Sequence, residues 1–165
     1  MRPVTVSRAF AVGFLFVGAM LVATGMGAAQ TDPALGTWTL NVAKSTYDPG
    51  PAPKSNTVTI EAAGKGTRTT AKGVDASGKA TGIEYTANYD GADSPVTLTG
   101  PQDYDTIALK RIDARRVEGT RKKAGKVVQT YSRVVSQDAK TMTITTKGTT
   151  ASGQKVSNVA VYEKK

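Results

Sequence analysis

The side chains best suited to chemistry in this sequence are tyrosines and arginines that alternate with smaller residues. Tyr85 and Tyr131 stand in stretches where every second residue would point to the same side of a strand. Arg111, Arg121 and Arg133 each have an apolar residue or a glycine two positions away. A buried arginine beside a tyrosine hydroxyl suits a ligand with a carboxylate head. We therefore predict that these five residues bind a ligand; exposed arginines and tyrosines that only fill a core are the alternative.

Residue types argue against most catalytic chemistry. The 165 residues include no His and no Cys, which excludes His-based metal sites, Ser-His-Asp and Cys-His catalysis, and disulfides. Glu61, Glu84, Glu118 and Glu163 fall in predicted strands. Paired carboxylates can serve acid–base chemistry, but on strands of a basic protein ion pairs with Lys and Arg are favoured. The sequence shows no phosphate loop and no EF-hand spacing. We predict no enzyme activity, no cofactor and no metal site.

The first residues predict an export signal. Two arginines precede an apolar stretch at 9–23, and small residues end at Ala29. This is the layout of a secretory signal peptide. We predict a signal peptide at 1–29 and a mature domain at 30–165, exported to the periplasm or out of the cell. An uncleaved anchor helix is the alternative, but the stretch is shorter than the ~20 apolar residues that a membrane span needs.

The mature domain would be basic. The signal peptide holds two of the 22 basic residues and none of the 13 acidic ones, which leaves the mature domain a net charge of +7. Such a balance attracts anions, although scattered charges are also typical of a solvated surface. Aromatic residues are not interleaved with the basic clusters, so we predict no specific binding of nucleic acid.

Ten short segments after residue 34 alternate in the manner of strands, and Gly-containing turns separate them. They are 35–42, 57–62, 67–74, 81–89, 96–99, 106–112, 116–122, 127–135, 141–147 and 156–163. Short hairpin links predict an all-β fold: a single antiparallel up-and-down barrel of about eight to ten strands, whose closure removes the exposed edges. Large apolar residues are few, because all three Phe lie in the predicted signal peptide. We therefore expect an interior lined by Thr and Tyr that can hold water or a ligand.

The start of the mature domain carries a recognisable motif. The stretch Leu35-Gly36-Thr37-Trp38-Thr39-Leu40 resembles the Gly-x-Trp signature on the first strand of lipocalins and fatty-acid-binding proteins, the calycin superfamily. The style of the mature sequence is similar to small secreted bacterial lipocalin-like proteins. The resemblance implies that Gly36 and Trp38 plug one end of the barrel. It also implies a basic side chain from a late strand packed on Trp38, with Arg133 the first candidate and Arg121 the second.

One feature of the calycin superfamily is in doubt here. Fatty-acid-binding proteins carry a helical lid between their first two strands. Residues 44–53 include three prolines, which predict a loop and no such lid.

Two functions fit these observations. The first is an exported lipocalin-like module that binds an apolar or anionic small molecule. The alternative is a structural or interaction protein of the cell envelope, which would act through its basic outer surface on an acidic envelope component without an internal ligand. In both cases we expect a monomer with no membrane span after signal cleavage. The volume of the barrel interior distinguishes the two functions, because a cavity of roughly 300 Å³ or more favours ligand binding.

Overall fold

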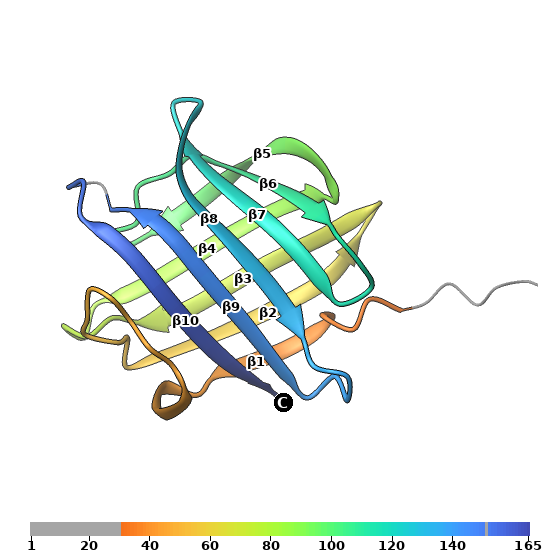
Figure 1. Ribbon diagram of the computed structural model, residues 1–165, viewed down its shortest axis with the longest axis horizontal. Helices are drawn as coiled ribbons and strands as arrows, with labels where there is room; N and C mark the ends of the chain where they lie inside the picture. Colours follow the sequence, from red (N-terminus) through yellow and green to blue (C-terminus); the bar gives the residue numbers. More distant parts are fainter. Residues whose placement is uncertain (1–30, 151) are drawn as a thin grey trace, which may run out of the picture. The chain divides into compact units, whose positions relative to one another are not determined.

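The computed structural model describes residues 31–150 and 152–165, and the predicted signal peptide lies outside them. Within these ranges the chain forms ten antiparallel strands (Figure 1). They are β1 (Gly36–Leu40), β2 (Ser55–Ala63), β3 (Gly66–Val74), β4 (Ala80–Asn88), β5 (Asp90–Thr99), β6 (Thr106–Arg111), β7 (Arg116–Lys123), β8 (Lys126–Val135), β9 (Thr141–Thr149) and β10 (Lys155–Lys164). The all-β prediction and the number of strands are confirmed.

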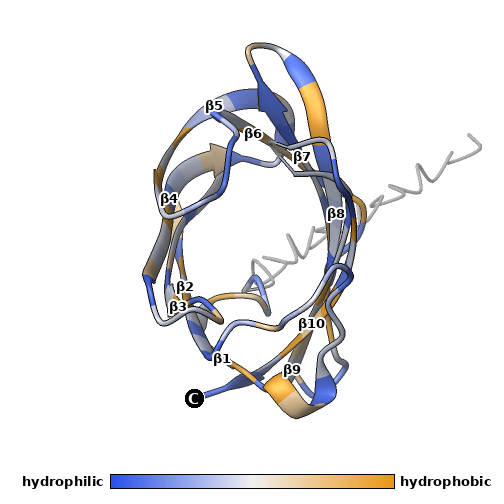
Figure 2. Ribbon diagram, turned by 90° about the vertical axis from the view of Figure 1, so that its left-hand side faces the viewer, coloured by the Kyte–Doolittle hydropathy of each residue, from blue (hydrophilic) through white to orange (hydrophobic). Residues whose placement is uncertain are grey.

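The strands close into a barrel in sequence order. Each strand pairs with the next, and β1 also pairs with β10, so the sheet has no free edge. Viewed from one end, the strands form a continuous ring (Figure 2). The up-and-down topology predicted from the short hairpin links is therefore confirmed. In the described ranges, no helix has the length and apolar character needed to cross a membrane.

One predicted strand is too short. The sequence predicts a strand at 96–99, whereas β5 begins at Asp90, which pairs with Lys110 of β6. The register with β6 shifts between Asp90 and Asp93, which is typical of a bulge.

The two ends of the barrel differ in what covers them. The chain enters β1 at one end, beside the hairpins that join β2 to β3, β4 to β5, β6 to β7 and β8 to β9. We call this the closed end, because Trp38 is fully buried there together with Met142 and Val135. The other end, the open end, carries the segments 41–54, 75–79, 100–105 and the loop between β9 and β10. A second apolar cluster, around Leu109 and Ile107, lies against β4 to β8.

The proline-rich segment after β1 is fastened to the rim of the open end. It holds a single 3₁₀ turn, Val42–Lys44, and no α-helix. Thr46 forms a bridge with Val159 of β10. The amide of Asp48 donates to Asn158 Oδ1 at 3.0 Å. The predicted absence of a helical lid is therefore confirmed, and this part of the rim is held in place by β10.

Candidate functional site

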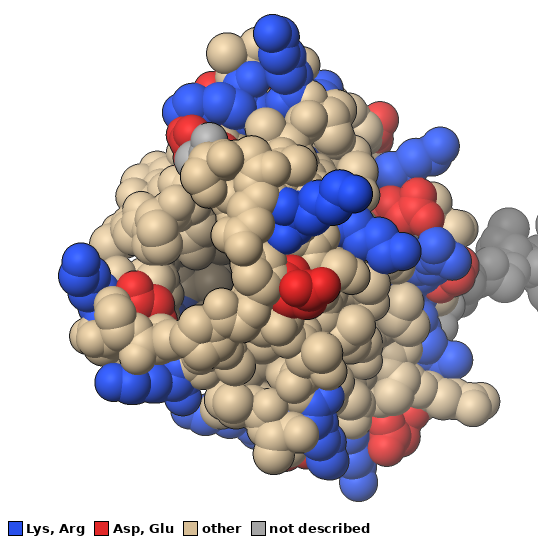
Figure 3. All heavy atoms as spheres, turned by 60° about the vertical axis from the view of Figure 1, so that its left-hand side comes forward, with Lys and Arg blue, Asp and Glu red and all other residues tan. Residues whose placement is uncertain are grey.

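The barrel contains one large cavity among its described residues. Its volume is about 620 Å³, well above the roughly 300 Å³ expected of a small-molecule site. The hollow is visible on the face that carries the open end (Figure 3). The interior is therefore not filled by side chains, which is the result expected of a binding module and not of the filled alternative.

The lining combines an apolar wall with a limited set of polar groups. The apolar wall consists of Val58, Ile60, Ala71, Ile83, Ile144, Val156 and Ala160. The rim of the open end contributes Tyr47, Pro49, Pro51, Pro53, Pro101 and Gln102. Polar groups inside include Asn56, Thr69, Tyr104, Arg121, Gln129, Arg133 and Thr146. This mixture is typical of sites that hold an apolar molecule and orient it by a few polar contacts.

Four of the five predicted ligand-binding residues line the cavity: Tyr85, Tyr131, Arg121 and Arg133. The alternation of each strand is the cause. Tyr85 on β4 and Tyr131 and Arg133 on β8 occupy inward positions, and the residues between them are more exposed. The fifth residue, Arg111, is not part of the lining.

Tyr85 and Tyr131 meet across the interior. They stand on β4 and β8, which form opposite walls of the ring (Figure 2), and their hydroxyl oxygens are 3.4 Å apart. Tyr131 reaches this position because its ring lies over Gly119 of β7. A Cβ atom at Gly119 would stand 2.1 Å from Tyr131 Cε1, so any side chain there would displace the ring. Gly119 is thus a positioning residue for Tyr131.

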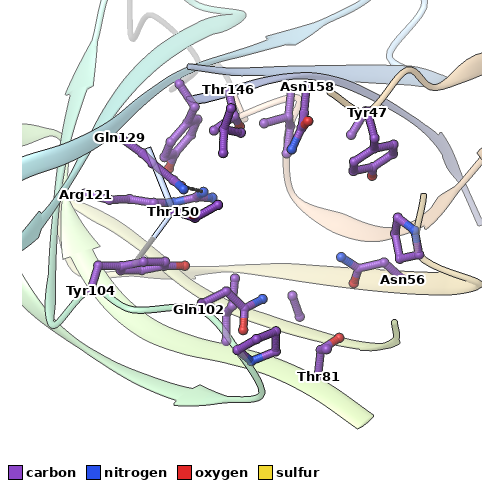
Figure 4. A pocket seen from close by; sticks show the side chains of 18 of the residues that line it. Tyr47, Asn56, Thr81, Gln102, Tyr104, Arg121, Gln129, Thr146, Thr150 and Asn158 are labelled. Atoms are coloured by element: carbon purple, nitrogen blue, oxygen red, sulfur yellow. Dashed lines mark hydrogen bonds between the residues drawn. The ribbon is translucent and has the colours of Figure 1, made fainter. Parts of the chain in front are cut away.

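Arg121 is held between two aromatic rings. Its guanidinium carbon lies 5.0 Å from the ring centroids of both Tyr104 and Tyr131. Nη1 donates to Gln129 Oε1 at 2.8 Å (Figure 4), whereas the buried Nε has no partner among the described residues. These contacts fix the cation in the cavity wall and leave hydrogen-bonding capacity unused.

Arg133 lies deeper and is only 3% exposed. Its Nη2 donates to the hydroxyl of Tyr89 at 2.9 Å. Among the described residues, neither Arg133 nor Arg121 forms an ion pair with a carboxylate. A buried charge without a counter-charge is costly, so Arg133 is the chemically most unusual residue of the interior, and the half-buried Arg121 is the second cation of the lining.

Arg111 serves the closed end, contrary to the prediction that it binds ligand. It forms an ion pair with Asp32 at 2.5 Å, and its guanidinium carbon lies 4.1 Å from the ring centroid of Tyr89. Tyr89 also donates to Asp32, at 2.6 Å. Burial alone would raise the pKa of Asp32, but hydrogen bonds from Tyr89, the Ala34 amide and Arg111 outweigh it and lower that pKa. Arg111 is not available to a ligand because it already pairs with Asp32, in the segment before β1.

The plug at the closed end uses a different cation from the two expected. Trp38 pairs in register with Lys164 of β10, and Lys164 Nζ lies 5.0 Å from the centroid of the indole ring. The prediction that Arg133 or Arg121 packs on Trp38 is wrong, because both arginines contact tyrosines instead. Gly36 has φ +121°, and a Cβ there would stand 2.9 Å from Lys164 Cε. The absence of a side chain at Gly36 therefore leaves room for Lys164 to lie over Trp38.

The sequence reasoning missed several polar residues of the cavity. Asn56 Oδ1, Thr69 Oγ1, Gln102 Oε1 and the Tyr104 hydroxyl are buried without a hydrogen-bond partner among the described residues. Figure 4 shows Asn56, Gln102 and Tyr104 around the cavity. Alternation along β2 and β3 could have identified Asn56 and Thr69 as inward residues. No local signal identifies Gln102 or Tyr104, because both lie outside the strands, in the segment between β5 and β6.

Tyr104, Tyr131 and Tyr162 of the cavity remain hydroxyl donors at neutral pH. Burial raises the pKa of Tyr104, and burial together with the neighbouring Tyr85 raises the pKa of Tyr131 well above its usual range. Burial also raises the pKa of Tyr162, whose hydroxyl accepts a hydrogen bond from Asn56 Nδ2 at 3.3 Å. The site therefore offers neutral donors around two cations.

Three of the four strand glutamates form ion pairs on the outside. Glu84 pairs with Arg68 at 2.5 Å, Glu118 with Arg116 at 2.7 Å and Glu163 with Lys44 at 2.9 Å. Acidic and basic groups are interspersed on the face drawn in Figure 3. Such pairing divides the basic surface into mixed-charge areas there.

No family model and no curated protein matches the chain. Among solved structures, the zebrafish ileal bile acid-binding protein in complex with cholic acid is similar, at 9% identity and a TM-score of 0.45. The match covers 81% of this chain and 99% of that chain.

Proposed function

We propose that this protein is an exported lipocalin-like barrel that binds a small apolar molecule with an anionic group. The observation that carries the proposal is Arg133, buried in the cavity wall with no carboxylate partner among the described residues. Arg121 adds a second cation of the lining that forms no ion pair within the ranges the structure describes.

The proposal depends on the free-energy cost of removing the arginine charges from water. Moving a guanidinium out of water is costly, and only a counter-charge with good hydrogen bonds offsets that cost. Among residues 31–150 and 152–165, Arg111 has such a counter-charge in Asp32, and Arg121 and Arg133 form no ion pair. A ligand carboxylate, sulfonate or phosphate would supply it, and charge-assisted hydrogen bonds to arginine are the strong ones.

The rest of the lining selects the body of the ligand. The apolar wall excludes a fully hydrophilic molecule, since burying it would leave its polar groups unpaired. The volume of about 620 Å³ suits a medium-chain acid or a compact ring system. An amphipathic acid meets both requirements.

Ligand binding is tested with two ligands that have the same alkyl length, one of them anionic and the other uncharged. In isothermal titration calorimetry of the barrel without its leader, decanoate should bind, and decanol should bind at least about tenfold more weakly, since one charge-assisted hydrogen bond is worth about 1.5–3 kcal/mol. Arg133→Gln should remove this difference, while Lys72→Gln, on an exposed position of β3, should not. Equal affinity for acid and alcohol would refute the anionic ligand, and no binding of either would refute the small-ligand function.

Export is a separate part of the proposal and rests on the apolar stretch at 9–23 with its preceding arginines. Expression of the full chain in a bacterium with a periplasm should yield a processed protein that begins at Gln30. N-terminal sequencing of the fractionated cells measures this. An unprocessed chain in the cytoplasm would contradict the export signal.

A further inference from the structure

Arg121 and Arg133, which form no ion pair in the part of the chain that the structure describes, have backbone positions on different sides of Tyr131. Tyr131 stands between Gln129 and Arg133 on β8, and Gln129 is the register partner of Arg121 on β7. At about 3.3 Å per residue, the backbone levels of Arg121 and Arg133 differ by about 13 Å along the strands. The cavity thus has one cation nearer the open end and another nearer the closed end.

We propose that the cavity contains two anion subsites, and that its preferred ligand is an apolar molecule with an acidic group at each end, such as a medium-chain dicarboxylate. The outer subsite is Arg121 with Gln129, and the inner subsite is Arg133 with Tyr89. This inference rests on the proposed function and specifies its ligand class.

The outer subsite keeps its charge because the nearby acids are engaged elsewhere. Asp103 and Asp75 are the acidic residues among the cavity lining. Asp103 pairs with Lys123 at 2.6 Å, and Asp75 accepts hydrogen bonds from Ser77 Oγ and the Lys79 amide. Within the described residues, neither acid forms an ion pair with Arg121, whose side chain donates to the neutral amide of Gln129.

The inner subsite also retains a net positive charge. Tyr89 donates its proton to Asp32, so its oxygen accepts from Arg133 without neutralising it. Asp32 is the ion-pair partner of Arg111. Asp32 thus pairs directly with Arg111 and is linked to Arg133 only through the Tyr89 hydroxyl, and Arg133 lines the cavity.

The space between the two subsites is uncharged. Tyr85 and Tyr131 contribute hydroxyls 3.4 Å apart, and Ile83 and Ile144 line the wall nearby. A spacer that carries charge would be desolvated there without a partner, whereas a methylene chain would gain from burial. A methylene chain that runs beside the Tyr85–Tyr131 pair would connect the two cations, so the lining is complementary to an acid–alkyl–acid ligand.

The test compares decanoate with decanedioate by calorimetry. We expect decanedioate to bind at least about tenfold more tightly, because it forms one more set of charge-assisted hydrogen bonds. Arg121→Gln and Arg133→Gln should each bring the diacid to within about threefold of the monoacid. Lys72→Gln is the control and should keep the full difference. If Arg133→Gln does not fold, Arg133→Lys, which keeps the charge, should retain part of the preference for the diacid.

The outcomes separate the two proposals. Decanoate that binds as tightly as decanedioate would overturn the two-subsite arrangement and leave the proposed function intact. A diacid preference that survives both Arg→Gln substitutions would also overturn it. Binding of neither acid would overturn the proposed function itself.

Discussion

The closed end and the open end of this barrel differ in how many of their buried polar groups are paired. At the closed end, Trp38 Nε1 donates to the Ala34 carbonyl at 2.8 Å, and Asp32 accepts from Tyr89, Arg111 and the Ala34 amide. Thr67 Oγ1 is a buried polar atom there without a partner among the described residues. Towards the open end, such atoms are more numerous and belong to Asn56, Gln102, Tyr104, Thr106 and Arg121. Arg133 lies between the two ends and donates to Tyr89 of the closed-end network. Satisfied networks stabilise a fold, and buried polar groups without a partner require an explanation such as a bound molecule. We therefore expect the closed end to contribute most to stability, and the groups from the open end to Arg133 to contribute to binding.

The largest effect should come from removing the plug. Trp38→Ala deletes a fully buried side chain and its hydrogen bond, and should lower the free energy of unfolding by about 3–5 kcal/mol. Val127→Ala is the control, since Val127 is 58% exposed, and should change it by no more than about 0.5 kcal/mol. Urea unfolding followed by circular dichroism measures both. A loss below about 1 kcal/mol for Trp38→Ala would remove the plug from the account.

A smaller loss is expected at the glycine that precedes the plug. Gly36→Ala combines an unfavourable φ with a close approach to Lys164 Cε, and should cost about 1–3 kcal/mol. Gly125→Ala has a positive φ but open space around its Cβ, so it should cost about 1 kcal/mol or less. The difference between the two variants in the same unfolding assay measures what the φ of +121° and the contact with Lys164 add together at Gly36. Equal losses would show that neither adds to the cost.

The Asp32 network should give the closed end a pH dependence. The pKa of Asp32 is lowered in the folded protein from its ordinary value of 3.8. Its carboxylate therefore stabilises the fold above that value, and the stabilisation is lost as pH falls through the folded pKa. Asp32→Asn should cost about 1–2 kcal/mol at neutral pH and progressively less below about pH 4. Thermal unfolding across this pH range checks the result, and a cost that is independent of pH would contradict it.

The smallest effect is expected at two hydroxyls of the cavity lining. Thr69→Val and Tyr104→Phe each remove a buried hydroxyl that has no partner among the described residues. Because no hydrogen bond is lost, the free energy of unfolding should stay within about 0.5 kcal/mol of the wild type or rise. The same urea assay suffices. A loss above about 1.5 kcal/mol for either variant would mean that the cavity, too, is built from satisfied polar groups.

Much of the fold follows from the sequence because it depends on local rules. Alternation and turn residues located all ten strands, and the short links indicated the closed meander. The same alternation placed Tyr85, Tyr131, Arg121 and Arg133 inside. Pairing between side chains was not accessible, since it depends on register. Lys164 meets Trp38 only because β10 and β1 close the barrel with those residues opposite each other.

The segments outside the strands were the least predictable part of the site. Asp32 precedes the first strand and Tyr104 lies between β5 and β6, so no periodicity reports where either side chain points. Asp32 decides that Arg111 belongs to the closed end, and Tyr104 helps to hold Arg121 in the cavity.

The central claim is that Arg133, which forms no ion pair among the described residues, binds the anionic group of a ligand. The most direct measurement is the free energy of unfolding of wild type and Arg133→Met, each with and without saturating decanoate. Binding to the native state alone stabilises by RT ln(1 + [L]/Kd), about 2.7 kcal/mol at a hundredfold excess over Kd. The account predicts such a gain for wild type, little gain for Arg133→Met, and ligand-free stability of the variant equal to or above that of wild type. An equal gain in both proteins, or a variant that is strongly destabilised without ligand, would contradict it.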